Sequence, residues 1–282
     1  MTPSLPTIQP DDLAEAEKAP HGGSFDAGKP VETNAALVDY LLRLGDDSLV
    51  LGQRLTEWCG HAPALEIDLS LANIGLDLIG QATLFLNLAG EVEDRGRDGD
   101  KLAFHRDVLA FRNCLLVEQP NGDFAQTIAR QFLFSTMQLS LFQRLTASTD
   151  TRIAEIAAKA VKEVHYHAGL AAEWVIRLGD GTDESRQRMI DGFDWFWRFV
   201  DEMFESDAIE QPLIASGIAV DRSELRPEFD ATVNRVLREA TLPLPSYPRA
   251  IKGGRSGHHG EHLGHLLAVM QYLPRTYPDA VW

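Results

Sequence analysis

Residues 66–90 read EIDLSLANIGLDLIGQATLFLNLAG, and this stretch decides the fold class. Its apolar residues occupy nearly every side of the helix that it would form, a pattern typical of helices buried on most of their surface. A turn at Pro63 precedes the stretch, and the apolar run extends to Gly90. We therefore expect one long central helix, around which the rest of the chain packs.

Apolar residues that recur at steps of three and four predict three further long helices, at residues 34–58, 123–146 and 151–178. Asp123 is expected to cap the second of these, with Gln126 completing a capping box. We interpret no stretch of the sequence as a strand. Four helices of about 25 residues, one pair of them separated by a long connection, are the layout of a ferritin-like bundle.

Shorter helices are expected around this bundle. Residues 101–116 predict one inside the long connection. Residues 182–206 predict another after the fourth long helix, with Thr182 as its N-terminal cap. Arg226-Pro227 places proline in the first turn of a further helix. The sequence HLGHLLAVMQYL, at residues 262–273, predicts the last one.

The chain is expected to consist of a tail and one domain. Residues 1–33 contain several prolines and scattered acids without an apolar period, which favours a flexible tail. Residues 34–282 are expected to form a single all-α, ferritin-like domain, with the core bundle at about 34–178 and extra helices at about 182–282.

The composition excludes several classes of protein. The formal net charge of -16 argues against nucleic-acid binding, because phosphates are bound by clustered Lys and Arg, and it favours solubility or a basic protein partner. Two cysteines, Cys59 and Cys114, are too few for a disulfide framework. No secretory signal or membrane span is apparent, so we expect a cytosolic protein.

A ferritin-like bundle holds a di-iron centre when two helices each supply a Glu and the other two each supply a Glu-x-x-His pair. Residues three apart on a helix face the same way, so both members of a pair reach the same metal. The residue three positions before each histidine therefore decides whether such a pair exists. These residues are Lys18, Trp58, Leu102, Lys162, Val164, Arg255, Ser256, His259 and His262. None is an acid, so the sequence contains no Glu-x-x-His pair.

Two segments lie where such pairs would fall, and both lack the ligands. In the central helix, Leu78 and Gln81 stand in the two ligand positions. In the 151–178 helix, Val164 stands three residues before His167. Residues 124–149 contain no Asp or Glu, so the remaining helix offers no carboxylate. We expect no metal, no other cofactor and no catalytic residue in this chain.

Polar residues remain on the predicted buried helices. Asn73, Asp77 and Gln81 lie at successive steps of four and form one stripe. Glu163 and His167 form a similar pair on the 151–178 helix. A buried carboxylate needs a partner, so an internal hydrogen-bond network is one interpretation, and a remnant metal site is the other.

Two further groups of polar residues are left open by the sequence. Asp46, Asp47 and Glu57 lie on the first long helix and could face inward. Near the C-terminus, His258, His262 and His265 stand at helical spacing and could coordinate zinc. The alternative for the histidines is a polar helix start that serves as a cap or an interface.

Five segments carry a resemblance to a known family. They are RLGDDSLVLGQRLTEWCGHAPALEIDLSLANIGLDLIGQA at 43–82, FRNCLLVEQPNGDFAQTIARQFLF at 111–134, AAKAVKEVHYH at 157–167, RLGDGTDESRQRM at 177–189 and GEHLGHLLAVMQYL at 260–273. The chain resembles the C subunits of bacterial phenylacetyl-CoA epoxidases, which are multicomponent monooxygenases. The resemblance covers roughly residues 34–206 and the last helix.

The resemblance implies a structural, non-catalytic subunit. Its expected partner is the catalytic di-iron A subunit, which uses oxygen and electrons from NADPH to epoxidise phenylacetyl-CoA and binds most of that substrate. Other epoxidase subunits are further expected partners. Two alternatives remain. One is a stand-alone metal-dependent oxidase or metal-binding ferritin-like protein, with Glu163, His165, His167 and the C-terminal histidines as ligands, and the other is an acyl-CoA binding protein.

Overall fold

The computed structural model describes residues 33–247, 249–278 and 280, and every regular element within them is a helix. The four longest are α2 (Thr33–Thr56), α3 (Leu65–Glu93), α6 (Phe124–Leu145) and α7 (Thr151–Gly179). They coincide with the four long helices predicted from the sequence, and the all-α, ferritin-like fold class is confirmed. The predicted tail at residues 1–33 lies outside the described residues, except for Thr33.

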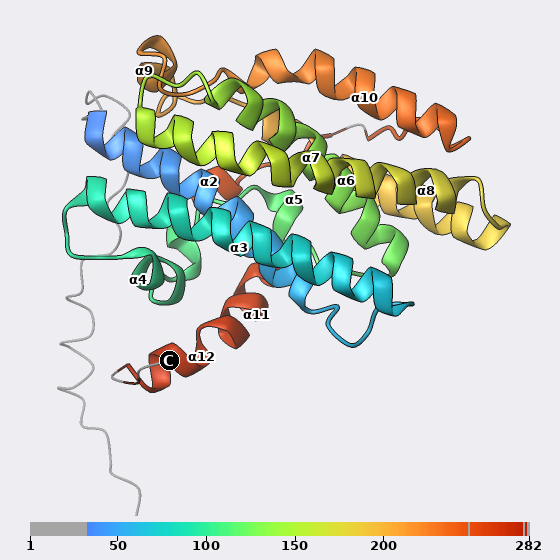
Figure 1. Ribbon diagram of the computed structural model, residues 1–282, viewed down its shortest axis with the longest axis horizontal. Helices are drawn as coiled ribbons and strands as arrows, with labels where there is room; N and C mark the ends of the chain where they lie inside the picture. Colours follow the sequence, from blue (N-terminus) through green and yellow to red (C-terminus); the bar gives the residue numbers. More distant parts are fainter. Residues whose placement is uncertain (1–32, 248, 279, 281–282) are drawn as a thin grey trace, which may run out of the picture. The chain divides into compact units, whose positions relative to one another are not determined.

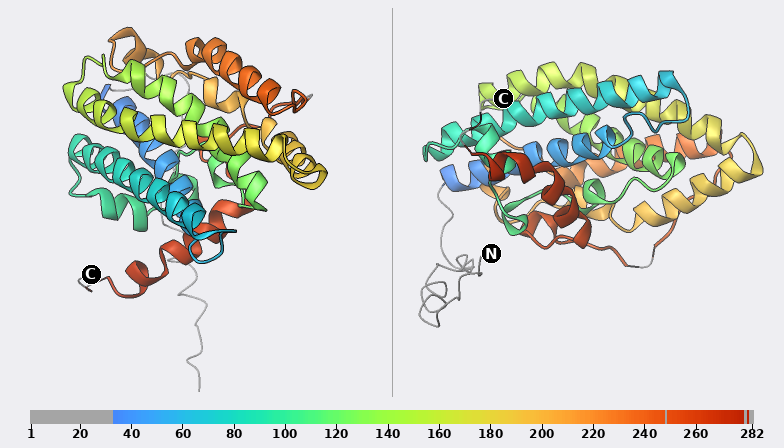
Figure 2. Two further views of the ribbon diagram at one scale, coloured as in Figure 1. Left: turned by 45° about the vertical axis from the view of Figure 1, so that its right-hand side comes forward. Right: turned by 90° about the horizontal axis from the view of Figure 1, so that it is seen from below.

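The four long helices form two layers (Figure 1 and Figure 2). Helices α3 and α7 lie side by side in one layer, and α2 and α6 lie behind them. Residues Glu32–Trp282 belong to one compact unit. Behind α2 and α6, the bundle is covered by α8 (Asp183–Trp197) and by C-terminal segments.

The most deeply buried helices are α2 and α6, and the expectation that residues 66–90 form the central helix is wrong. Helix α6 is buried on nearly all sides, because α7, α8 and α10 (Arg226–Glu239) pack around it. Helix α3 keeps one exposed side that includes Leu69 and Leu76. Hydrophobic periodicity records how many sides of a helix are apolar, but it does not record which of them meet another helix.

Two helix starts agree with their predicted caps. The Asp123 side chain accepts a hydrogen bond from the backbone N–H of Gln126, whose side chain binds the Asp123 N–H in return. Thr182 forms the same reciprocal arrangement with Ser185 at the start of α8. These two boxes fix where α6 and α8 begin.

The predicted helix at residues 101–116 is wrong in its extent. The segment contains only α4 (Gly99–Phe104), the 3-10 turn η1 (Val108–Ala110) and the single turn α5 (Leu115–Glu118). The backbone N–H groups of Arg112 and Cys114 are bound by Asp46 and Asp47 instead of by helical carbonyls. In this segment, acceptors on a distant helix therefore satisfy backbone N–H groups that a local helix would otherwise have satisfied.

The C-terminal third consists of short helices. Helix α8 ends at Trp197, before the predicted end at Ser206, and the chain continues into the short helices at the end of this paragraph. Residues 240–253 form an irregular crossing, apart from residue 248, which is not described. The short helices are η2 (Asp201–Phe204), α9 (Gln211–Ala215), η3 (Arg222–Leu225), η4 (Gly254–Ser256), α11 (Glu261–Met270) and α12 (Tyr272–Thr276).

Glycines bring α2 and α3 close together. A Cβ built at Gly52 would lie 3.2 Å from the Gly75 carbonyl oxygen, and one at Gly45 would lie 2.8 Å from the Leu86 side chain. Leu86 is buried and has little room to move. By contrast, a Cβ at Gly80, on the exposed side of α3, would meet no atom within 4 Å.

These two environments give opposite expectations for the same substitution. Gly45→Ala should lower the free energy of unfolding by about 1–3 kcal/mol, because the added methyl overpacks against Leu86. Gly80→Ala should raise it by up to about 1 kcal/mol, because alanine is the better helix former and has space. Urea unfolding of the two variants tests this, and equal effects would contradict the proposed contact.

Candidate functional site

Each of the four long helices contributes one polar side chain to a chain of hydrogen bonds at the centre of the bundle. Gln138 on α6 donates through Nε2 to Ser48 Oγ on α2 at 3.4 Å and to Gln81 Oε1 on α3 at 3.2 Å. Gln81 Nε2 donates in turn to Glu163 Oε2 on α7 at 3.0 Å. Three of the four, Ser48, Gln81 and Gln138, are buried. These four side chains are thus linked through three hydrogen bonds, while Gln138 Oε1 is buried without a protein partner.

A second pair lies one helical turn away. His167 Nε2 on α7 is 3.0 Å from Asp77 Oδ2 on α3. The imidazole is fully buried, whereas the Asp77 side chain is 37% exposed. Burial lowers the pKa of His167 below its ordinary value of 6.5, and the hydrogen bond with Asp77 opposes that shift. At neutral pH His167 is therefore a neutral side chain held beside a solvated carboxylate.

The structure places the predicted ligand-like positions inside the bundle. Leu78, Val164, Gln81 and His167 are all buried. It also joins Gln81 to Glu163 and Asp77 to His167, but it separates Asn73 from them. Asn73 lies on the exposed side of α3, so its inclusion in the buried network is wrong. A step of four along a helix that turns every 3.6 residues drifts around its axis, which carries Asn73 outward.

The donor atoms at this centre do not fit a di-iron site. Leu78 and Val164 have no ligand atom, and the one carboxylate, Glu163, already accepts from Gln81. In the described part of the chain, no three His, Cys, Asp or Glu residues are grouped so as to hold a metal ion. The His165 ring is exposed and does not join His167.

The acids of the first long helix face a different part of the molecule. Asp46 pairs with Arg106, and Asp47 Oδ2 accepts from Arg255 Nη2 at 2.7 Å. Both carboxylates are buried against the connection and the C-terminal crossing. Glu57 is exposed and pairs with Arg54. None of the three reaches the hydrogen-bond chain at the bundle centre.

Sequence reasoning missed three other buried carboxylates, Glu118, Glu202 and Glu210. Glu202 Oε1 accepts from the backbone N–H groups of Gly253 and Gly254, at 2.9 and 2.8 Å, and Oε2 accepts from Leu115 at 2.7 Å. Burial raises the pKa of Glu202, and these N–H groups oppose that rise. Glu118 Oε1 accepts from the Gly260 N–H at 2.7 Å. No local sequence signal marks acceptors whose donors lie so far along the chain.

The C-terminal histidines do not converge on one point. His258 and His265 are exposed, and His262 is half-buried. His259 is buried instead, with Nδ1 2.7 Å from Glu118 Oε2 and Nε2 3.1 Å from the Phe111 carbonyl oxygen. The predicted alternative of a metal site at His258, His262 and His265 is therefore not supported by their placement. The segment anchors the start of α11 through His259.

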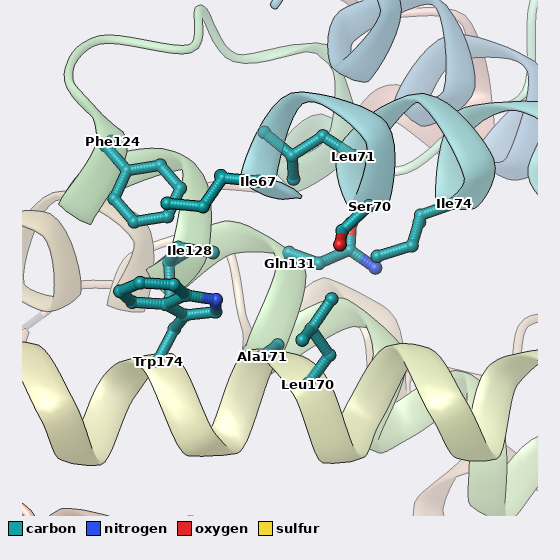
Figure 3. A pocket seen from close by; sticks show the side chains of 10 residues that line it. All are labelled: Ile67, Ser70, Leu71, Ile74, Phe124, Ile128, Gln131, Leu170, Ala171 and Trp174. Atoms are coloured by element: carbon teal, nitrogen blue, oxygen red, sulfur yellow. The ribbon is translucent and has the colours of Figure 1, made fainter. Parts of the chain in front are cut away.

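A small void lies between α3, α6 and α7 (Figure 3). Its volume is about 10 Å³, which is room for roughly one water molecule. Gln131 points into it, and both polar atoms of its side-chain amide lack a protein partner. A water molecule is the expected occupant, since the void is far too small for an acyl-CoA. Its lining residues are Ile67, Ser70, Leu71, Ile74, Phe124, Ile128, Gln131, Leu170, Ala171 and Trp174.

Comparison with known proteins agrees with this architecture. Residues 25–282 match the family described as phenylacetic acid catabolic protein. The chain belongs to that family. It is 52% identical over 246 residues to the C subunit of the 1,2-phenylacetyl-CoA epoxidase of Escherichia coli (strain K12), and the match covers 87% of this chain and 99% of that relative. The resemblance inferred from the sequence is confirmed.

Helix α3 is notably apolar. Among the described residues, α3 alone is long and apolar enough to span a membrane by length and composition. Core helices of soluble proteins pass the same test, and 44% of the most apolar window of α3 is buried. The rest of that window is half-buried or belongs to the exposed side of the helix.

The pairing of Glu202 gives a prediction for stability. Glu202→Ala should lower the free energy of unfolding by at least about 3 kcal/mol, because three backbone N–H groups lose their acceptor at about 1–3 kcal/mol each. The matched control is Glu205→Ala, which removes an exposed pair with Lys252 and should cost less than about 1 kcal/mol. Urea unfolding measures both variants. Similar losses of unfolding free energy would contradict the role of Glu202 as the acceptor of these three N–H groups.

The lowered pKa of His167 gives a prediction for pH dependence. In the unfolded chain His167 binds a proton near pH 6.5, whereas in the folded chain it does so only at lower pH. The contribution of neutral His167 to the free energy of unfolding is therefore present above pH 6.5 and is lost as the pH falls below that value. The Tm advantage of the wild type over His167→Gln should therefore shrink between pH 7.5 and pH 5.5. His165→Gln, an exposed control on the same helix, should show no such trend.

Proposed function

We propose that this chain is a non-catalytic subunit of a bacterial phenylacetyl-CoA epoxidase complex in phenylacetate degradation. The epoxidase subunit that it resembles over 87% of its length supports the complex and the pathway. The bundle centre supports the non-catalytic role. There, Gln138 donates to both Ser48 and Gln81, and Leu78 and Val164 fill the positions where a di-iron relative holds ligands.

In this proposal the chemistry belongs to a partner. The catalytic A-type subunit would hold the iron, bind most of phenylacetyl-CoA and receive electrons from NADPH through other subunits. The chain described here would contribute a rigid helical body in the bacterial cytosol that keeps the partner folded and shapes its substrate pocket. A net charge of -16 suits a soluble protein with a basic partner.

Two alternatives have weaker support. A metal-binding or oxidase role would need Glu163, His165 and His167, or the C-terminal histidines, to converge, and in the described chain they do not. An acyl-CoA binding role would need cations for the phosphates of CoA. The hollow of about 600 Å³ beside α12 offers Lys101 but also Asp98 and Asp100. Calorimetry of the isolated chain with phenylacetyl-CoA tests that role, and micromolar binding would favour it.

Reconstitution tests the proposed function. Co-expression with the A-type subunit should give a stable complex, and epoxidation should require both chains. Glu163→Gln and Gln81→Leu should leave the rate within about twofold of wild type, whereas loss of a catalytic acid or base would lower it about 10²-fold or more. The chain purified alone should hold almost no iron. About two irons per chain would instead identify a di-iron protein and contradict the proposal.

A further inference from the structure

One side of α3 has no partner within the chain. Leu65, Leu69 and Leu76 are 70%, 56% and 64% exposed. Together with Asn73, Gly80 and Thr83, which are also exposed, they form the α3 outer face. These six residues follow one another at steps of four and three, the spacing by which one helix packs along another. Helix α3 itself lies at the front of the bundle in Figure 1.

The α3 outer face lacks charge in a chain that is otherwise strongly charged. Between residues 69 and 90 the sequence contains a single charged residue, Asp77, which is paired with His167. The exposed side of the neighbouring α7 is different. It carries Arg152, Glu155, Lys159, Lys162, Glu173 and Arg177. Long uncharged and partly apolar surfaces on a soluble chain mark sites of protein–protein contact.

Gly80 gives an independent indication of close approach. Glycine in the middle of a helix costs about 1 kcal/mol relative to alanine. Gly52 and Gly75 are explained by the contact between α2 and α3, but nothing lies within 4 Å of a Cβ at Gly80. Gly80 also lies within the α3 outer face. A backbone from outside the chain, packed against this point, would account for it.

The charge around the face indicates what kind of chain covers it. Glu66 and Glu91 are exposed and lie near the two ends of α3, about 37 Å apart along the helix axis, although Glu91 also lies beside Arg152 of α7. A second copy would bring together two chains that each carry a net charge of -16. A basic partner, with Lys or Arg near both ends of its contact, meets the same acids favourably.

We propose that the α3 outer face docks an uncharged helix of the catalytic epoxidase subunit, one that is flanked by basic residues opposite Glu66 and Glu91. This assignment rests on the proposed function, because it takes the epoxidase partner as the occupant. The partner helix lies along the seam from Leu65 to Thr83 and approaches most closely at Gly80.

The decisive variant is Leu76→Lys, with Leu244→Lys as its matched control. The two leucines are 64% and 62% exposed, so neither change should unfold the chain. Leu244 belongs to the crossing after α10, which lies on the opposite side of the unit from α3 (Figure 2). Binding to the purified A-type subunit is measured by interferometry. Leu76→Lys should weaken it at least about tenfold and Leu244→Lys by less than about twofold, because a Lys charge is buried only in the first case.

Two further variants probe the close approach and the acidic ends. Gly80→Ala should weaken the complex although it stabilises the isolated chain, a divergence that a purely internal role of Gly80 would not produce. The double reversal Glu66→Lys with Glu91→Lys should slow association and remove its dependence on salt, because flanking charges act mainly on the encounter rate.

The outcomes separate this inference from the proposed function. If the wild-type chain forms no complex with the A-type subunit, the proposed function fails, and the docking assignment fails with it. If the complex forms and the Leu76→Lys variant binds the A-type subunit with an affinity within about twofold of wild type, only the docking assignment is wrong. Self-association lost in Leu76→Lys would make a second copy the occupant. Binding of anionic phospholipid vesicles through this face would make a membrane the occupant instead.

Discussion

Asp46 and Asp47 are adjacent residues in the middle of α2, and both are removed from water. A buried carboxylate is tolerated only with partners, and these two draw theirs from Arg106, the 112–114 backbone and Arg255. Glu118 and Glu202 bind the backbone of residues 253–260 in the same way. These buried acids lie on the side of α2 that faces away from the bundle centre. Their need for hydrogen-bond partners determines the path of the connection between α3 and α6 and of the C-terminal third.

The other side of α2 meets the bundle centre, where the polar groups are mostly neutral. Amides and a hydroxyl can pair with one another at a modest desolvation penalty, whereas several carboxylates at one point repel unless cations lie between them. The chain Ser48–Gln138–Gln81–Glu163 needs no such cation, since its one carboxylate reaches the bundle edge. The molecule thus separates its charged pairs from the centre of its four-helix core.

Local signals in the sequence located the long helices well. The capping box of Asp123 and the cap of Thr182 are encoded within four residues, so they could be predicted without the fold. The prediction for residues 101–116 failed because their hydrogen-bond partners lie on α2, some 60 residues earlier. Of the predicted polar network, Asp77, Gln81, Glu163 and His167 pair as neighbours, but Gln138 and Ser48 were missed, since amides and hydroxyls are common on any helix.

The anchoring of the C-terminal crossing has a consequence for the order of folding. Arg255 meets Asp47 across 208 residues of sequence, and His259 meets Glu118 across 141. A chain emerging from the ribosome would hold these carboxylates without their partners until residues 255–259 had been made. Completion of the fold is therefore a late, long-range event, and closing such loops is entropically slow.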